Sequence, residues 1–186
     1  MNMQSLSALM EDELRDLYSA ENQLIKALPK LAKKASSSQL KAAFTGHFKE
    51  TEGHVKRLQQ IGKILEIDLG GKKCHAMEGL VQEGAEALEL DGPPAVIDSA
   101  LIGAARRVEH YEMAAYCSTR GMAVQLGNDR VAKLLEETTN EEEAADDKLK
   151  AIAVDEVFPE AAESGDSEED DDRARPAGST RVGSAK

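Results

Sequence analysis

Apolar residues recur at alternating steps of three and four along four long stretches of the sequence. In the first stretch the repeat is made of Leu14, Leu17, Leu24, Leu28 and Leu31. An α-helix turns once every 3.6 residues, so residues at this spacing form a stripe on one face, and that face packs inward in a bundle. The position between Leu17 and Leu24 holds Glu21 instead of an apolar residue. A carboxylate on the inward face of a helix restricts the possible folds to those that can neutralise it.

The other three stretches have the same kind of interruption near mid-length. Each carries an apolar stripe in which one or more positions hold a polar or charged residue. Acid therefore lies on or beside the inward face of all four predicted helices. The residues concerned are His47, Thr51 and His54 with the neighbouring Glu50 in the second stretch, Glu109 and Glu112 in the third, and Glu142 with Asp146 in the fourth.

Turn-forming residues divide the stretches and predict how they are connected. Serines 36–38 separate the first helix from the second, and Gly127-Asn128 separates the third from the fourth. A longer connection between the two pairs contains a short amphipathic helix over residues 74–90. Only 3% of residues are aromatic and none is Trp, which argues against a sandwich or barrel. We therefore expect an all-α four-helix bundle with one long crossover that carries an additional short helix.

The composition changes near residue 158. From there the sequence reads PEAAESGDSEEDDDRARPAGSTRVGSAK after Phe158, an acidic run followed by Arg, Gly and Ser with almost no apolar residue. Such a segment cannot bury enough surface to offset its loss of entropy on ordering. The predicted organisation is a helical bundle over residues 1–157 and a disordered tail over residues 158–186.

Charge and cysteine usage limit the possible partners. The formal net charge is −12, which disfavours nucleic acid as a partner because phosphate binding needs clustered Lys and Arg. No apolar run reaches the roughly 20 residues that a membrane helix needs. Cys74 and Cys117 are too few for a disulfide framework, and no signal-like segment opens the chain, so we expect a cytoplasmic protein with no membrane partner.

Several carboxylates in one bundle core repel one another and lose hydration, so something must neutralise them. Inward bases are scarce, which leaves raised pKa values or bound divalent metal. Bundles with Glu on every helix and His on some build carboxylate-bridged di-iron and di-manganese sites. Oxygen and imidazole ligands suit Fe or Mn, and the lack of an inward thiolate argues against structural zinc. For any single residue the alternative is a solvated position at the edge of a stripe.

Five segments of the sequence resemble one known family. They read DLYSAENQLIKALPKLAKKA, HFKETEGHVKRLQQI, GKKCHAMEGL, VEHYEMAAY and LLEETTNEEEAADDKL. Together they are similar to the YciE/YciF family of ferritin-like stress proteins over about residues 5–155. The resemblance implies a ferritin-like four-helix bundle, a homodimer, a rubrerythrin-type di-iron centre and a ferroxidase activity tied to stress response.

The resemblance also implies a set of metal ligands. Its carboxylates match Glu21, Glu50, Glu109, Glu112 and Glu142. The Glu-x-x-His pattern of ferritin-like proteins is absent, because its histidine falls at Gly53 after Glu50 and at Ala145 after Glu142. We expect His54 to complete the shell. His47 and Asp146 are further candidate ligands, and Tyr18 and Tyr116 are candidates for hydrogen bonding to a ligand.

Three functions fit these residues. The leading hypothesis is a di-iron oxidase in which two Fe ions react with O2 or peroxide. A manganese catalase-like centre that removes peroxide is the second, since oxygen-rich sites also accept Mn. The third is a dimeric structural or interaction module without catalysis, whose buried acids are protonated or paired with bases.

Overall fold

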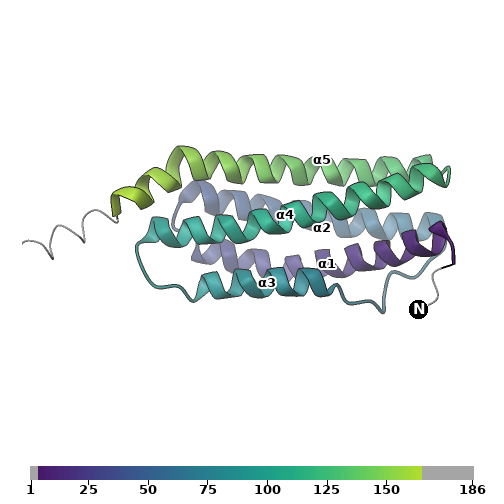
Figure 1. The fold of residues 1–186 in the computed structure, drawn as a ribbon, viewed down its shortest axis with the longest axis horizontal. Coiled ribbons are helices and arrows are strands. Elements are labelled where there is room, and N and C mark those ends of the chain that lie inside the picture. Colours follow the sequence, from purple (N-terminus) through teal and green to yellow (C-terminus); the bar gives the residue numbers. More distant parts are fainter. Residues whose placement is uncertain (1–3, 165–186) are drawn as a thin grey trace, which may run out of the picture.

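The computed structural model describes residues 4–164, and the chain there is almost wholly helical. Figure 1 shows the helices lying roughly parallel to one axis. Their bounds match the breaks predicted at serines 36–38 and at Gly127-Asn128 and the short helix predicted over residues 74–90. The helices are α1 (Leu6–Lys34), α2 (Ser38–Leu65), α3 (His75–Leu88), α4 (Pro94–Gln125) and α5 (Asp129–Ile152).

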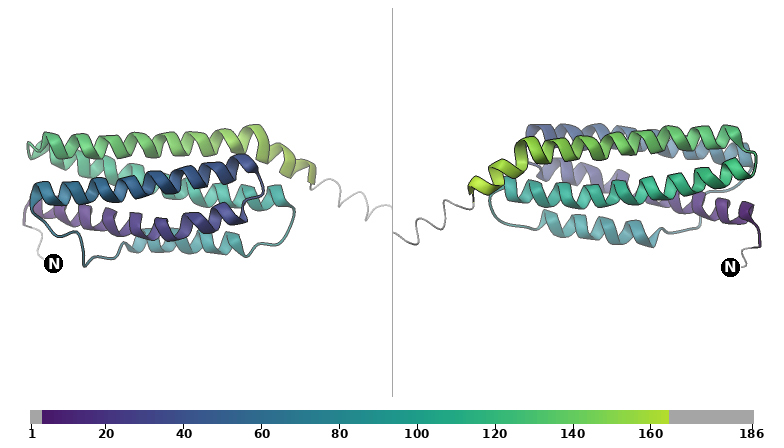
Figure 2. Two further views of the ribbon diagram at one scale, coloured as in Figure 1. Left: turned by 180° about the vertical axis from the view of Figure 1, so that it is seen from behind. Right: turned by 45° about the horizontal axis from the view of Figure 1, so that its top comes forward.

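Four of the helices form a bundle and the fifth lies outside it. α1 packs on α2, α2 on α5, α5 on α4 and α4 on α1, which closes a ring of four. α3 lies in the crossover and packs against α1 and α4 (Figure 2). Short turns make α1–α2 and α4–α5 antiparallel pairs, whereas the crossover makes α2 and α4 parallel (Figure 1). This confirms the predicted all-α, ferritin-like four-helix bundle with one long crossover and an additional short helix.

Capping residues fix where the helices begin and end. The Ser37 hydroxyl accepts a hydrogen bond from the Leu40 amide, and the Cys74 sulfur accepts one from the Met77 amide. α4 ends at Gln125, and the positive φ of 72° at the following Gly127 lets the Asn128 amide donate back to the Ala123 carbonyl. These local signals place the turns, and the turns set the register of the two helical pairs.

A layer of polar side chains divides the core of the bundle. One apolar cluster contains Leu24, Leu28 and Phe44, and the other contains Leu14, Leu17 and Leu58. Along each bundle helix, the switch from one cluster to the other falls at the charged positions found in the sequence. The bundle is therefore closed by apolar packing on both sides of a buried polar layer.

The helical path continues beyond α5. A π-helical segment, η1 (Ala153–Val157), follows directly, and residues 158–164 are helical as well. Ser37 donates a hydrogen bond to Glu156 Oε1 at 2.7 Å, which attaches this segment to the α1–α2 turn. Residues 158–164, the first part of the predicted tail, are thus helical, and the buried Val157 continues the apolar stripe of α5 up to them. The rest of the predicted tail, residues 165–186, lies outside the described residues.

Two further sequence expectations can be compared with the structure. Neither cysteine of the described chain is in a disulfide, Cys74 being buried and Cys117 exposed. Among residues 4–164, no helix is both long enough and apolar enough to cross a lipid bilayer.

Asp98 of α4 holds the turn between α1 and α2. Its side chain is 2% exposed, and its carboxylate accepts hydrogen bonds from the amides of Ser36 and Ser37 at 2.7–3.2 Å. A buried carboxylate that accepts backbone amides is a strong, charge-assisted contact. Asp98 therefore connects the second helical pair to the turn of the first.

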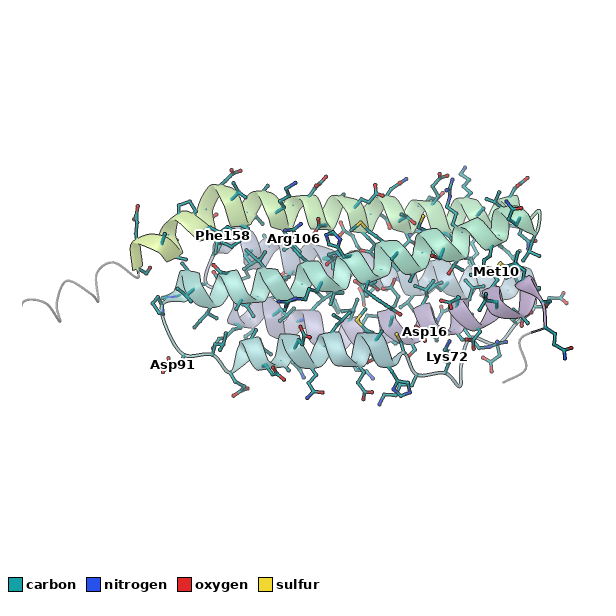
Figure 3. All side chains as sticks on the ribbon, in the orientation of Figure 1. Met10, Asp16, Lys72, Asp91, Arg106 and Phe158 are labelled. Atoms are coloured by element: carbon teal, nitrogen blue, oxygen red, sulfur yellow. The ribbon has the colours of Figure 1, made fainter. Side chains whose placement is uncertain are left out.

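We expect Asp98→Ala to lower the free energy of unfolding by at least about 2 kcal/mol, because two backbone amides lose their acceptor. Asp91→Ala is the matched control, since Asp91 is exposed in the loop between α3 and α4 (Figure 3). Urea unfolding followed by circular dichroism measures both variants. Equal stability of the two variants would contradict the role of Asp98.

Candidate metal centre

Six buried side chains meet in the polar layer at the middle of the bundle. α1, α2, α4 and α5 each contribute at least one of them. Their exposure ranges from 0% for Glu21, His54, Glu112 and Glu142 to 6% for His47. The six, called the cluster below, are Glu21, His47, His54, Glu109, Glu112 and Glu142.

Helical spacing explains how each helix delivers its residues. His47 and His54 are seven residues apart, about two turns, so both imidazoles project from one face of α2. Glu109 and Glu112 are three apart and occupy one face of α4. Thr51 lies between the two histidines along α2, and its hydroxyl donates to the His47 carbonyl and not to a cluster side chain.

The cluster consists of two groups that share one carboxylate. In the first group His47 Nε2 lies 3.4 Å from Glu109 Oε2 and 3.7 Å from Glu142 Oε2, and Glu112 completes it. In the second, His54 Nδ1 lies 3.4 Å from Glu21 Oε1 and 3.0 Å from Glu142 Oε1. The two oxygens of Glu142 thus face different groups.

Most of the atoms that face the centre of the cluster have no hydrogen-bond partner. They include His47 Nε2, His54 Nδ1, Glu109 Oε2 and both oxygens of Glu112 and of Glu142. Buried polar atoms are almost always satisfied, so a convergent set of unsatisfied ligand atoms requires an explanation. Carboxylate oxygen and imidazole nitrogen are the atoms that bind iron, manganese and similar divalent ions. The residues present therefore fit a metal centre.

Outer carboxylates orient both imidazoles. His54 Nε2 donates to Glu141 Oε2 at 2.9 Å, and Arg57 holds that carboxylate with contacts of 2.8 and 3.0 Å. His47 Nδ1 lies 3.4 Å from Glu50 Oε2. A ring nitrogen that donates outward leaves the other nitrogen free to accept a metal ion. Each histidine is thus turned with its unpaired nitrogen toward the glutamates.

Burial and mutual charge change the proton affinity of the cluster. Loss of hydration raises the pKa of Glu21 and Glu112, and raises that of Glu109 to about 8. Burial opposes charging of His47, but Glu109, Glu50 and Glu142 outweigh it and raise its pKa to about 9. Burial also lowers the pKa of His54, but the contacts with Glu142 and Glu21 have the larger, opposite effect and raise it to about 11. Without metal, protons on the histidines and glutamates therefore offset the negative charge of the cluster.

Tyr116 supports the second group. Its hydroxyl donates to Glu21 Oε1, and the whole side chain is buried. Burial raises the pKa of Tyr116 well above its usual range, and the charges of Glu21 and Glu112 raise it further. The residue is therefore a neutral donor that fixes one oxygen of Glu21 and leaves Oε2 free.

The structure brings together most, but not all, of the residues predicted from the sequence. Glu21, His54, Glu109, Glu112 and Glu142 are in the cluster, and His47, predicted as a further candidate, is also in it. Glu50 is outside the cluster: its side chain is 53% exposed. It follows His47 by three residues, which turns it about 60° from the face that carries the histidines.

Asp146 and Tyr18 also lie outside the cluster. Asp146 accepts from Arg106 Nε and Nη2 at 2.7 and 3.0 Å, a two-contact ion pair near the middle of α4 (Figure 3). This pairing lowers the pKa of Asp146 and uses both of its oxygens. Tyr18 accepts from Gln59 at 3.2 Å near the surface. An inward helical position is thus not enough to make a carboxylate part of the cluster.

No pattern in the sequence indicates the roles of Glu141 and Arg57. Glu141 belongs to the run Glu141–Glu143, which the sequence suggests is mostly solvated, and Arg57 lies in an ordinary basic stretch of α2. Their contact joins residues 84 positions apart, so no local spacing could reveal it. The one local indication is that Glu141 directly precedes Glu142, which places it next to the cluster.

Comparison with known proteins agrees with this architecture. The family model described as a domain of unknown function, DUF892, matches residues 5–162. Protein YciF of Escherichia coli (strain K12) is 43% identical over 162 residues, which are 87% of this chain and 98% of the relative. The chain belongs to the DUF892 family and to the family of YciF. This confirms the resemblance found in the sequence segments.

Solved structures give the same result. The crystal structure of the E. coli stress protein YciF matches with a TM-score of 0.81 and 42% identity, covering 84% of this chain and 99% of that one. YcfI from Rhodopseudomonas palustris matches with a TM-score of 0.79 and 38% identity over 82% and 98%. A protein from Xanthomonas campestris, at 17% identity and a TM-score of 0.66 over 90% and 99%, shares the fold.

The raised pKa values predict how the metal-free protein responds to pH. His47, His54 and Glu109 bind protons more tightly folded than unfolded, with pKa values of about 9, 11 and 8 against ordinary values of 6.5 for His and 4.5 for Glu. Their contribution to stability is complete at low pH and is lost as pH rises through the folded values. We expect the urea midpoint of the metal-free protein to fall between pH 6 and pH 9.

Chelator-treated protein unfolded in urea at several pH values tests this expectation. Glu109→Gln removes one of the titrating groups and is expected to make the decline shallower. Glu136→Gln, an exposed position on α5, is the control that leaves the slope unchanged. A midpoint that rises over this range would contradict the assignment.

Glu112 offers a test of the cost of the cluster without metal. Both of its oxygens are buried and have no partner. Glu112→Leu removes them, so we expect the metal-free protein to gain about 1–3 kcal/mol in free energy of unfolding. Glu143→Leu, an exposed position, is expected to change it by less than about 0.5 kcal/mol. Thermal or urea unfolding measures both, and a destabilised Glu112→Leu protein would show that Glu112 is satisfied without metal.

Proposed function

We propose that this protein is a di-iron carboxylate protein that oxidises Fe(II) with O2 or peroxide, a ferroxidase acting in stress protection. The observation that supports the proposal is the pair of ligand groups that share Glu142. Each group contains one histidine and at least two carboxylates, all buried and with inward atoms that lack a hydrogen-bond partner. The stress-protein designation of the E. coli relative agrees with the physiological part of the proposal.

Charge balance favours two divalent ions. The cluster contains four glutamates, and two divalent cations would neutralise their four negative charges. Glu109, Glu112, His47 and Glu142 would hold one ion, and Glu21, His54 and Glu142 the other. On binding, the cluster releases the protons that it holds when metal-free, because the same atoms cannot bind both.

The protein's own residues create the conditions for the reaction. The ions, when bound, supply the electrons for reduction of the oxidant. Carboxylates favour the more highly charged ferric product, since its extra positive charge is attracted more strongly. The apolar clusters on both sides keep water away from the centre, and Glu141 with Arg57 holds the His54 proton on Nε2. These features favour oxidation within the bundle.

Two alternatives keep the same cluster. Manganese accepts the same ligands, and a manganese centre would remove peroxide in a catalase-like cycle. A non-catalytic dimeric module would keep the acids protonated, and the R. palustris relative is described as a candidate structural protein. The homodimer and the cytoplasmic location stay predictions. The unsatisfied inward atoms favour metal over the module, because protonated acids in a purely structural core would pair with each other.

Metal stoichiometry tests the proposal. Metal-free protein is loaded anaerobically with Fe(II) or Mn(II), and the bound metal is measured after desalting. We expect about two ions per chain in the unaltered protein. Glu142→Ala removes the shared ligand and is expected to lose both ions, whereas Glu21→Ala is expected to keep close to one. Glu136→Ala, an exposed acid on the same helix as Glu142, keeps two.

Addition of O2 or peroxide to the Fe(II)-loaded protein then tests the activity. We expect ferric absorbance in the near ultraviolet to grow faster than in buffer containing the same iron. Iron binding by Glu21→Ala and Glu142→Ala equal to that of the unaltered protein would refute the metal centre. Peroxide removal by the manganese form alone would favour the second function, and a stable protein that binds neither metal would favour the module.

A further inference from the structure

A hollow between α2 and α5 connects the surface with the cluster. Its volume is about 250 Å³, and its lining includes His47 and Glu109. A larger hollow of about 310 Å³ between α3 and the bundle has no cluster residue in its lining. The smaller hollow is therefore the one of the two that leads to the ligands.

The lining of this hollow contains both exposed and buried polar side chains. Glu50 and Glu141 are at the outer end, with side chains 53% and 40% exposed. His47 stands between the two ends: Nδ1 lies 3.4 Å from Glu50 and Nε2 lies 3.4 Å from the buried Glu109. One imidazole thus touches both an exposed carboxylate and a cluster carboxylate.

Small residues of α5 leave room for this hollow. Ala144 and Ala145 line it, together with the apolar side chains of Ala43, Phe44 and Leu149. Ala145 stands three residues after Glu142, the position at which a Glu-x-x-His motif would place an imidazole. With a methyl group there, the side of the bundle is open next to the ligands.

Approach along the bundle axis is unfavourable by comparison. The two apolar clusters cover the polar layer on both sides, and a cation crossing either of them would lose its hydration without any ligand in exchange. Oxygen and nitrogen atoms along the α2–α5 hollow can replace water step by step. The charge at the opening has both signs, because Lys148 also lines it and acts on Glu50.

We propose that the hollow between α2 and α5 is the entrance through which divalent cations reach the cluster, with Glu50 as the carboxylate that first captures the ion. This rests on the proposed function, because it requires that the cluster binds metal. It gives Glu50 a role outside the ligand set: Glu50 controls the rate of uptake and not the number of ions held.

Stopped-flow uptake of Co2+ by the metal-free full-length protein tests the proposal, with the visible absorbance of bound Co2+ as the signal. Glu50→Gln removes a negative charge at the opening and keeps an acceptor for His47. We expect it to slow uptake roughly threefold or more at low salt. Lys148→Gln removes a repelling charge and is expected to speed uptake, and both effects are expected to shrink at high salt.

Matched variants distinguish the effect of a charge at the opening of the hollow from the effect of the protein's net charge. Glu52→Gln on α2 and Lys150→Gln on α5 make the same charge changes at exposed positions outside the hollow, and both are expected to take up Co2+ at the unaltered rate. Ala145→Leu narrows the hollow and is expected to slow uptake. Equilibrium titration of every variant is expected to reach the same number of ions.

The outcomes distinguish the two proposals. If the unaltered protein binds Co2+ and the Glu50, Lys148 and Ala145 variants all take it up at the unaltered rate, the entrance lies elsewhere and the metal centre stands. If Glu50→Gln loses an ion at equilibrium, Glu50 is a ligand and its capture role is wrong. If the unaltered protein binds no Co2+, Fe2+ or Mn2+, the metal centre fails and the entrance fails with it.

Discussion

The interaction on which the rest of the structure depends is the meeting of four glutamates and two histidines inside an otherwise apolar bundle. Charges at this depth repel one another and lose their hydration, and the folded chain keeps them only by holding protons or cations there. The two apolar clusters on either side supply the packing that tolerates this cost. The apolar packing is thus located toward the two ends of the bundle and the candidate metal centre at its middle, along the same four helices.

The surroundings of the cluster determine what it can bind. Arg57 and Glu141 hold His54 from outside, Tyr116 holds Glu21, and Arg106 takes Asp146 out of the layer. Each of these contacts holds one cluster side chain or removes a neighbouring charge from the layer. The inward carboxylate and imidazole atoms carry protons when the cluster is alone and can bind a cation in their place, which links the metal-free pKa shifts to the proposed function.

Membership of the DUF892 family and the close match to YciF establish the fold and the relatives of this chain. They do not supply a reaction, and the reaction is inferred from the cluster. The hollow beside His47 adds a second level to that inference, since a buried centre must exchange ions with solvent through some opening. Ala145, which stands where a Glu-x-x-His motif would place a histidine, is small enough to leave space for this opening.

The sequence by itself determined the helices, their order, the crossover and most of the cluster. Helical periodicity is local, and an acid in an apolar stripe is visible without coordinates, which is why Glu21, Glu109, Glu112 and Glu142 could be predicted. Only the tertiary structure decided between His47, Glu50 and Asp146, because their positions differ by rotations of about 40–60° around a helix and by which base lies opposite. It also supplied Glu141 and Arg57, whose contact spans 84 residues. The distance between facing helices, which no spacing along the chain encodes, separates a cluster residue from an ion-paired neighbour.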